Sequence, residues 1–287
     1  MARPAVLITG CSSGIGRSLC WEFQRRGYPV IATARCLEVL TDLQAAGMHT
    51  YSLDVTQVDQ IQKLVDTLQA DNLTPGILVN NAGYGLFGPL MDLPPTAIAA
   101  QFATNVVAPM QLVQAIAPLM KAQGSGLILN IASVSSVFTT PFAGAYCGSK
   151  AALRALSTAL RMELAPFGIQ VVTVHPGAIA SDFGNKAQVS APAPTTADVS
   201  WYVSLAEDIQ MRANLSQQNA TPSDDFARQL VQMIADSSLP PEVWLGKKSL
   251  QLPLLQRWLP TRLLERILKR RFGLDRLNYE TPSNSPD

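Results

Sequence analysis

Short apolar segments alternate with longer amphipathic ones through roughly the first 180 residues of the chain. The short segments are apolar at successive positions rather than at every second one, which is typical of strands buried on both faces of a parallel sheet. Strands are expected at Ala5–Thr9, Val30–Thr33, His49–Leu53, Ile77–Val79, Leu127–Ile131 and Ile169–Val174. Helices are expected over roughly Ile15–Arg26, a stretch ending near Ala46, Gln57–Gln69, Thr96–Lys121 and Tyr146–Ala165. Because crossovers between parallel strands are right-handed, this alternation predicts an α/β fold with a doubly wound, mostly parallel sheet of Rossmann type and helices on both faces.

One domain is expected to account for most of the chain. Of the 287 residues, 47% are hydrophobic and 15% charged, which provides a large core and excludes the disordered and collagen-like classes. We expect this domain over residues 1–246, with helix-like segments at Val203–Ser216 and Thr221–Asp236 and a last strand at Glu242–Leu245. Residues 181–220 follow a late strand, where an insertion lies near the carboxyl ends of the sheet, so they are predicted to form a substrate lid. Residues 247–287 form a basic amphipathic extension.

A glycine-rich turn, Thr9-Gly10-Cys11-Ser12-Ser13-Gly14-Ile15-Gly16, follows the first strand. Glycines here allow a sharp turn, close approach of the backbone to a pyrophosphate and tight packing of the next helix on the strand. The N-terminus of that helix offers free N–H groups to the phosphates. An ordinary glycine turn has the same composition, so the position between a strand and an amphipathic helix carries the prediction of a dinucleotide site. Its expected contacts are Gly10, Ser12, Ser13, Gly14, Ile15 and Gly16.

The end of the second strand indicates which dinucleotide binds. Folds specific for NAD usually place a carboxylate there for the ribose hydroxyls, whereas NADP needs a cation for the 2′-phosphate. Here the strand runs from Val30 into Arg35 without an acid. A guanidinium suits a phosphate through paired N–H donors, although a solvated surface Arg would give the same pattern. The sequence therefore predicts NADP(H), bound in part by Arg35.

Tyr146 and Lys150 begin the helix expected at Tyr146–Ala165. Residues four apart share a helix face, so the phenol and the ammonium point the same way. A free phenol has a pKa near about 10, and a neighbouring cation lowers that pKa toward the range of a general acid or base. A solvated helix face would carry the same pair by chance. Following a dinucleotide turn, however, the pair predicts a catalytic site.

Four motifs resemble those of the single-domain short-chain dehydrogenase/reductases. They are the Thr-Gly-x-x-x-Gly-x-Gly spacing of the turn, Asp54 after the third strand, Asn80-Asn81-Ala82-Gly83 after the fourth and Pro176-Gly177 after the sixth. The resemblance is strong over roughly the first 180 residues and loose beyond them. It implies further cofactor contacts from Asp54, Val55, Asn81, Ala82, Gly83, Tyr146, Lys150, Pro176, Gly177, Ile179 and Ser181. Ser181 stands where many members carry Thr.

The resemblance also implies the catalytic roles. Ser133 takes the family's serine position, with Ser135 and Ser136 ranked second, and Asn105 takes the position that holds a water for proton relay to Lys150. In reduction, Ser133 and Tyr146 bind the carbonyl oxygen and Tyr146 supplies the proton. We therefore expect an NADP(H)-dependent oxidoreductase acting on a carbonyl or secondary alcohol. An orienting or packing role is expected for His175.

Two other functions were weighed. The nucleotide-sugar epimerases share the fold and the Tyr/Lys pair, but usually carry the different spacing Thr-Gly-x-x-Gly-x-x-Gly and a larger C-terminal domain. A non-catalytic NADP(H)-binding sensor or scaffold needs no proton relay, and the full set of Ser133, Tyr146, Lys150 and Asn105 argues against it. With four cysteines and two histidines in no ligand-like spacing, neither a metal site nor a disulfide framework is expected, and the cysteines are predicted to be small buried hydrophobes.

The sequences of the tail and the predicted lid indicate what these segments contact. From residue 241 on there are nine Lys or Arg against five Asp or Glu. Within Leu252 to Phe272, the apolar residues Leu263, Leu264, Ile267 and Leu268 fall on one side of an expected basic amphipathic helix and Arg262, Arg266, Lys269 and Arg270 on the other. Such a helix lies on an anionic membrane or packs over the active-site mouth or a partner subunit. Phe183, Trp201, Tyr202, Leu205 and Met211 suit either a lipophilic pocket or the core of a lid.

The tail and several motifs look like a group containing hydroxysteroid and retinol dehydrogenases and acyl-dihydroxyacetone-phosphate reductases. We expect a lipophilic small-molecule substrate and a homodimer or homotetramer. The net charge of +1 predicts no nucleic-acid partner. Because a strand begins at the N-terminus, leaving no room for a signal peptide, and no run of 18 uninterrupted apolar residues occurs, a cytoplasmic protein with peripheral membrane contact is expected.

Overall fold

The computed structural model describes residues 3–180, 200–217, 219–236 and 239–277. Its main feature is a seven-stranded sheet in the order β3-β2-β1-β4-β5-β6-β9, in which every neighbouring pair is parallel. The strands are β1 (Ala5–Thr9), β2 (Val30–Ala34), β3 (His49–Ser52), β4 (Pro75–Asn80), β5 (Gly126–Ile131), β6 (Ile169–Pro176) and β9 (Glu242–Leu245). The order reverses between β1 and β4, and this switch point opens a ligand crevice beyond the carboxyl ends of the strands.

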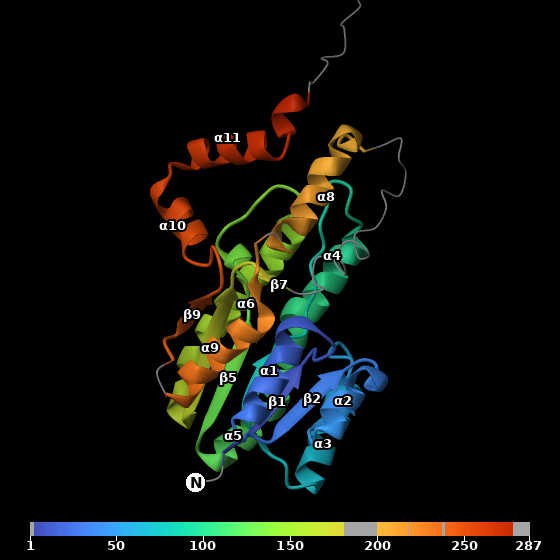
Figure 1. Cartoon of the computed structure of the whole chain (residues 1–287), viewed down its shortest axis with the longest axis vertical. Helices are drawn as coiled ribbons and strands as arrows, with labels where there is room; N and C mark the ends of the chain where they lie inside the picture. The colour runs from blue at the N-terminus through green and yellow to red at the C-terminus, as the bar shows by residue number, and fades with distance from the viewer. Residues whose placement is uncertain (1–2, 181–199, 218, 237–238, 278–287) are drawn as a thin grey trace, which may run out of the picture.

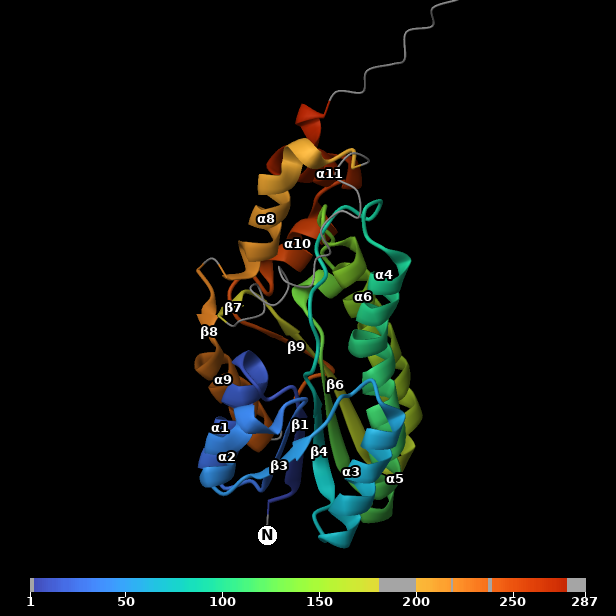
Figure 2. The same cartoon turned by 90° about the vertical axis from the view of Figure 1, so that its right-hand side faces the viewer.

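Helices cover both faces of the sheet (Figure 2). One face carries α1 (Gly14–Arg25), α2 (Thr41–Ala45) and α9 (Ser223–Ala235); the other carries α3 (Val58–Ala70), α5 (Ala108–Gln123) and α6 (Gly144–Leu164). Each layer encloses its own hydrophobic core, represented by Phe23 and Phe226 on the first face and by Leu68 and Ile116 on the second. The predicted doubly wound sheet of Rossmann type is therefore confirmed. All pairs of neighbouring strands in this seven-stranded sheet of the described chain are parallel.

The helix predicted over Thr96–Lys121 is interrupted in the structure. It consists of α4 (Pro95–Phe102), a π-helical turn at Ala103–Val107 and α5. A π turn widens the helix locally, and such turns are frequent at functional sites. The sequence pattern missed the break because the widened turn depends on contacts that Asn105 makes with a distant loop.

The same stretch is long and apolar enough to meet the criteria for a membrane span. Within the described chain, Pro95–Gln123 is the single helical segment that does so. Its residues Leu112, Val113 and Ile116 are buried in the core cluster on the sheet. The apolar face of this helix therefore belongs to the interior of the domain.

Beyond the carboxyl ends of the strands lie the described part of the predicted lid, residues 200–217, here called the lid, and the tail, residues 247–277 (Figure 1). The lid contributes α8 (Ala206–Asn214), and the tail contributes α10 (Gln251–Trp258) and α11 (Thr261–Arg271). Two short strands, β7 (Ile179–Ala180) and β8 (Thr221–Pro222), form a separate parallel pair at the base of the lid. Single turns of 3-10 helix occur at Leu37–Leu40, Val134–Ser136, Ala165–Phe167, Val203–Leu205, Leu215–Gln217 and Leu274–Arg276.

The tail and the cysteines can be compared with the predictions. The tail forms two helices, α10 and α11, because Pro260 cannot continue a helix and Leu259 before it is extended; the amphipathic stretch expected around Leu263–Leu268 lies within α11. Of the four cysteines, three are buried as predicted, but Cys36 is exposed. Part of the predicted lid, residues 181–199 with Ser181 and Phe183, lies outside the described residues.

Candidate active site

The glycine turn is held by close contacts that only glycine allows. Gly10 has a φ of +73°, and a Cβ atom there would lie 2.8 Å from the Cα of Ala82. A Cβ on Gly16 would lie 2.5 Å from the carbonyl oxygen of Gly10. The first glycine therefore brings β1 against the loop after β4, and the last packs α1 against the turn.

Thr9 and Asn81 join the turn to the loop after β4. The hydroxyl oxygen of Thr9 accepts hydrogen bonds from the backbone N–H groups of Asn81 and Ala82, both at 3.0 Å. The side-chain amide of Asn81 donates to the carbonyl oxygens of Thr9 at 2.8 Å and Gly10 at 3.2 Å. Thr9 was not among the predicted site residues, although it opens the Thr-Gly motif. Its buried hydroxyl fixes the two glycine-containing loops relative to each other.

A single cavity of about 1540 Å³ runs along the carboxyl edge of the sheet, from the glycine turn to the tail. It brings together most of the residues predicted from the sequence. Those that line it are Gly10, Ser12, Ser13, Gly14, Ile15, Arg35, Asp54, Val55, Asn81, Ala82, Gly83, Ser133, Tyr146, Lys150, Pro176, Gly177 and Ile179. Gly16 and Asn105 do not line it. Gly16 packs behind the turn, and Asn105 lies behind Gly83 and Tyr84.

The turn and the two strands beside it provide a cradle that fits a dinucleotide phosphate. Helix α1 begins at Gly14, so its first N–H groups face the cavity with the positive end of the helix dipole. Arg35 is exposed on the same cavity directly after β2, and no carboxylate of the described chain pairs with it. Asp54, after β3, accepts hydrogen bonds from the N–H of Thr56 at 3.0 Å and its hydroxyl at 2.7 Å. These contacts hold the Asp54 loop against the cavity.

Tyr146, Lys150 and Ser133 lie together at the other half of the cavity. Tyr146 and Lys150 occupy the first turns of α6, and both are buried. The Lys150 ammonium donates a 2.8 Å hydrogen bond to the carbonyl oxygen of Ile131, the last residue of β5. Ser133 follows two residues later and hydrogen-bonds to the phenol of Tyr146. The end of β5 therefore positions both the hydroxyl beside the phenol and the ammonium one helical turn away.

The protein's own groups hold Tyr146 in its protonated form. Burial raises the pKa of Tyr146 to about 12, with the Ser133 hydrogen bond and the positive charge of Arg212 acting in the opposite direction. Burial lowers the pKa of Lys150 to about 8. The prediction that Lys150 lowers the pKa of Tyr146 is not met by these residues, because desolvation outweighs the charges and the nearby cation that acts on the phenol is Arg212.

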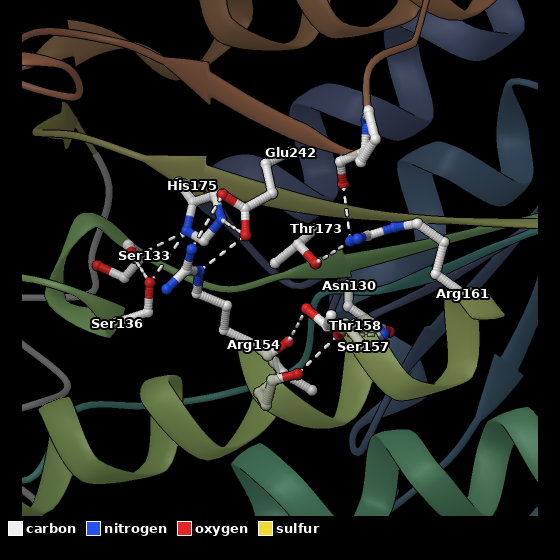
Figure 3. A network of polar contacts seen from close by, with 12 residues as sticks. Asn130, Ser133, Ser136, Arg154, Ser157, Thr158, Arg161, Thr173, His175 and Glu242 are labelled. Carbon is white, nitrogen blue, oxygen red and sulfur yellow. Dashed lines mark hydrogen bonds and ion pairs between the residues drawn. The ribbon is translucent and has the colours of Figure 1, made fainter. Parts of the chain in front are cut away.

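His175 supports the serine from below the cavity (Figure 3). Its Nδ1 atom lies 3.2 Å from the carbonyl oxygen of Ser133 and 3.0 Å from the hydroxyl of Ser136, and its ring stacks on Trp244. Burial lowers the pKa of His175 to about 4, so the ring is neutral near pH 7. Its other nitrogen lies 3.8 Å from Glu242, which pairs with Arg154 at 2.7 Å. His175 therefore packs and orients the Ser133 loop.

A polar chain crosses the centre of the sheet beneath the site. The Asn80 amide donates to Asn130 at 2.8 Å, and the Asn130 amide donates to the Ser157 hydroxyl at 2.8 Å. This chain ties β4 and β5 to α6, the helix that carries Tyr146 and Lys150. Buried polar groups that pair in this way fix the register of the elements that they join.

The tail supplies much of the apolar end of the cavity, and most of the aromatic and apolar residues named for the lid fall into the second of the two alternatives, the core of the lid. Trp201 is 73% exposed, while Tyr202, Leu205 and Met211 belong to a cluster with Phe142 and Phe272. Tyr202, Leu205 and Met211 therefore form lid core, and none of the three lines the cavity, which the lid reaches through Arg212 and Leu215. The lining comes from the tail instead, from Leu252, Leu255, Leu259, Leu264, Ile267, Leu268 and Phe272. Packing of the tail over the mouth of the site was one of the alternatives raised by the sequence.

Arg212 is a site residue that sequence reasoning missed. It lies on α8, lines the cavity and is buried, with its guanidinium 5.0 Å above the ring of Phe87. Phe87 in turn packs on Tyr146, with ring centroids 5.8 Å apart. Nothing in the local sequence of a polar helix distinguishes this arginine from a solvated one.

Together the fold and the site define a Rossmann-type oxidoreductase with a buried Ser-Tyr-Lys centre. The family model for short chain dehydrogenases matches residues 4–191. The chain belongs to this family.

Individual relatives agree over nearly the full length. The chain is 34% identical to a short-chain dehydrogenase of Pyricularia oryzae over 94% of this chain and 95% of that one. It is 31% identical to an NADPH-dependent 1-acyldihydroxyacetone phosphate reductase of Saccharomyces cerevisiae over 96% and 93%. A crystal structure of a short-chain dehydrogenase from Streptomyces avermitilis superposes with a TM-score of 0.76 at 26% identity, covering 98% of this chain and all of that one.

Proposed function

We propose that the protein is an NADP(H)-dependent reductase of a lipophilic ketone or aldehyde, reversible in principle as an alcohol dehydrogenase. The observation that carries the proposal is the single cavity, which joins the glycine turn and Arg35 at one end, Ser133, Tyr146 and Lys150 in the middle, and apolar tail residues at the other end. A cofactor, a reacting carbonyl and an apolar chain would be accommodated in that order.

The choice of NADP(H) rests on Arg35. A cation directly after β2, with no carboxylate in its place, fits the 2′-phosphate and leaves the ribose hydroxyls of NAD without an acceptor. The NADPH dependence in the name of the yeast relative supports the same choice. When bound, the nicotinamide would supply or accept the hydride.

The chain's own residues would handle the oxygen and the proton. Ser133 and Tyr146 donate hydrogen bonds to the substrate carbonyl oxygen and stabilise the negative charge that develops there. Tyr146 then gives its proton to that oxygen. With a pKa of about 12, the phenol carries its proton near pH 7 and has it available to donate. Lys150, protonated at neutral pH, lies one helical turn away to replace the proton, and Asn105 behind Gly83 completes the relay.

The apolar end of the cavity supports a lipophilic substrate. Seven of the lining residues supplied by α10, α11 and their flanks are Leu, Ile or Phe. The substrate class in the name of the yeast relative, an acylated ketone, also carries an apolar chain. Steroids and retinoids share the apolar character without that chain.

The test is NADPH oxidation by the purified full-length chain against acyl ketones, steroids, retinoids and quinones. Turnover of at least one class with a preference for NADPH over NADH is expected. Tight NADPH binding with no turnover of any class would instead favour the alternative, an NADP(H)-binding sensor or scaffold.

We also propose that the outer face of the tail contacts an anionic membrane surface. While Leu252 and Leu255 line the cavity, Leu254 and Leu263 are exposed and Trp258 is 77% exposed. The last turn of α11 carries Lys269, Arg270 and Arg271. Exposed apolar side chains beside a cationic segment suit the headgroup region of an anionic bilayer.

Co-sedimentation with vesicles at moderate salt tests this contact. Binding to vesicles containing phosphatidylserine, but not to phosphatidylcholine alone, is expected, and Trp258→Ala should weaken it. Trp21→Ala, on the surface of α1, is the matched control. Equal recovery of the Trp258 and Trp21 variants with the vesicles would contradict the proposal.

A homo-oligomer is proposed through α5 and α6, whose outer positions Val107, Leu156 and Met162 are exposed at or beside these helices. Light scattering with size-exclusion chromatography tests it. A dimer or tetramer is expected, and a monomer at micromolar concentration would contradict it.

A further inference from the structure

Arg212 presents a buried guanidinium to the substrate end of the cavity. The residue is 6% exposed and belongs to α8, and its Nε atom donates a hydrogen bond to the hydroxyl of Thr140. This is one of five N–H donors that a guanidinium carries. Its remaining contact is the stacking on Phe87. Arg212 also lines the cavity, so the unused donors have access to a ligand.

No carboxylate of the described chain pairs with this guanidinium. Burying an uncompensated cation is costly, and proteins keep such a group where an anion pairs with it. The cost is visible here as a lowered pKa of Arg212, which burial causes.

The wider cavity has the same sign of charge. Among the charged residues of the described chain that line it, Arg35, Lys150, Arg212, Lys248 and Arg271 are cationic, and Asp54 is the one acid. Arg35 and Asp54 lie at the glycine-turn end, and Lys150 lies beside Tyr146 in the middle. At the substrate half, Arg212 on the lid and Arg271 on the tail are close enough for their charges to interact. The substrate end is therefore cationic among its otherwise apolar side chains.

We propose that Arg212, assisted by Arg271, is a specificity-determining residue that binds an anionic group, a phosphate or a carboxylate, on the lipophilic substrate. Phe87 contacts both the Tyr146 ring and the Arg212 guanidinium, which places the anion one aromatic ring away from the reacting oxygen. The substrate is thus a ketone with its anionic group a few bonds from the carbonyl and an apolar chain directed toward α10 and α11. This inference rests on the proposed reductase function and specifies its substrate class.

Two matched pairs of soluble ketones test the inference with NADPH. The phosphate pair is 1-hexanoyl-dihydroxyacetone phosphate and 1-hexanoyl-dihydroxyacetone; the carboxylate pair is a medium-chain 5-oxo acid and its methyl ester. For one pair, the native protein should favour the anionic member by roughly 10- to 100-fold in kcat/KM, as expected for a charge-assisted hydrogen bond. The preferred pair tells phosphate from carboxylate.

Substitutions at Arg212 and at two arginines of the tail test whether the Arg212 guanidinium causes this preference. Arg212→Met, which keeps an unbranched stem and removes the guanidinium, should raise KM for the anionic ketone by roughly 10-fold or more and KM for its uncharged partner by much less. Arg212→Lys should retain part of the preference. Arg271→Gln should weaken it severalfold, whereas Arg270→Gln, which removes the same charge from a neighbour outside the cavity, should not.

Binding provides a readout that does not depend on turnover. Octyl phosphate and octanoate should bind the native protein with NADP⁺ more tightly than octanol by calorimetry, and Arg212→Met should abolish the difference. Unchanged binding in that variant would overturn the inference even if no ketone were reduced. A rise in KM for NADPH itself, or an equal loss of kcat with charged and uncharged ketones, would also overturn it, by placing Arg212 with the cofactor or with the Tyr146 proton. Failure of the proposed reductase function would look different from failure of the Arg212 inference. In that case neither the native protein nor any variant would reduce any ketone.

Discussion

The side-chain amide of Asn105 hydrogen-bonds to both backbone groups of Tyr84, accepting from its N–H at 3.1 Å and donating to its carbonyl oxygen at 2.9 Å. The same amide donates to the hydroxyl of Ser149 at 3.0 Å. A Cβ on Gly83 would lie 3.0 Å from Asn105 Oδ1 and 3.6 Å from Lys150 Nζ. Asn105 therefore joins the π turn, the loop after β4 and α6 at a point beside the Lys150 ammonium.

Asn105→Ala is expected to lower kcat by about 10- to 100-fold and to reduce the free energy of unfolding by roughly 1–3 kcal/mol, because a buried side chain loses its three hydrogen bonds. Steady-state kinetics and urea unfolding measure the two effects. Gln101→Leu is the control, since Gln101 donates to the same Tyr84 carbonyl at 3.0 Å but contacts neither Ser149 nor Gly83. An equal loss of kcat in both variants would assign Asn105 a structural role alone.

Tyr146→Phe is expected to lower kcat by about 10²- to 10⁴-fold, the usual contribution of a positioned acid. The phenol is removed while the ring that packs on Phe87 remains. The Kd for NADPH, measured by fluorescence titration, should change by less than about threefold. Tyr202→Phe, in the lid core, should retain full activity. Full turnover by Tyr146→Phe would remove Tyr146 from the mechanism.

Arg35→Ala should raise KM for NADPH by roughly 10- to 100-fold and leave KM for NADH nearly unchanged, because a charge-assisted contact with the 2′-phosphate is lost. The ratio of kcat/KM for the two cofactors is the measurement. Lys63→Ala, an exposed cation on α3 outside the cavity, controls for net charge. A native preference for NADH would contradict the choice of cofactor.

His175 is expected to make the fold sensitive to acid. Its pKa in the folded chain is about 4, below the ordinary value of 6.5, because burial disfavours the charged ring. The unfolded chain therefore binds more protons between these values. Stability from this group is complete above about pH 6.5 and falls as the pH drops toward 4, by at most about 3 kcal/mol.

Urea unfolding between pH 4 and 8 measures this dependence. His175→Gln should flatten the fall in unfolding free energy below pH 6.5, whereas His49→Gln, at an exposed histidine on β3, should not. The same slope in native and His175→Gln proteins would show that other groups cause the acid sensitivity.

The sequence by itself determined the sheet, the dinucleotide turn and the Tyr146/Lys150 pair. These features depend on local chemistry: buried strands need continuous apolar runs, the turn needs Gly10 because its φ is positive, and residues four apart share one helix face. Each is therefore readable from neighbouring residues.

Only the tertiary structure decided the π turn, the substrate end of the cavity and the state of the phenol. The π turn depends on Asn105 meeting Tyr84, and the tail lines the cavity because Phe272 is anchored beside Phe142, 130 positions away in the numbering. Arg212 is buried with its guanidinium above Phe87, and burial raises the pKa of Tyr146 to about 12, whereas the neighbouring lysine in the sequence had suggested a lower value. Desolvation and long-range contacts arise only when the chain is packed, so they cannot be predicted from a short stretch of neighbouring residues.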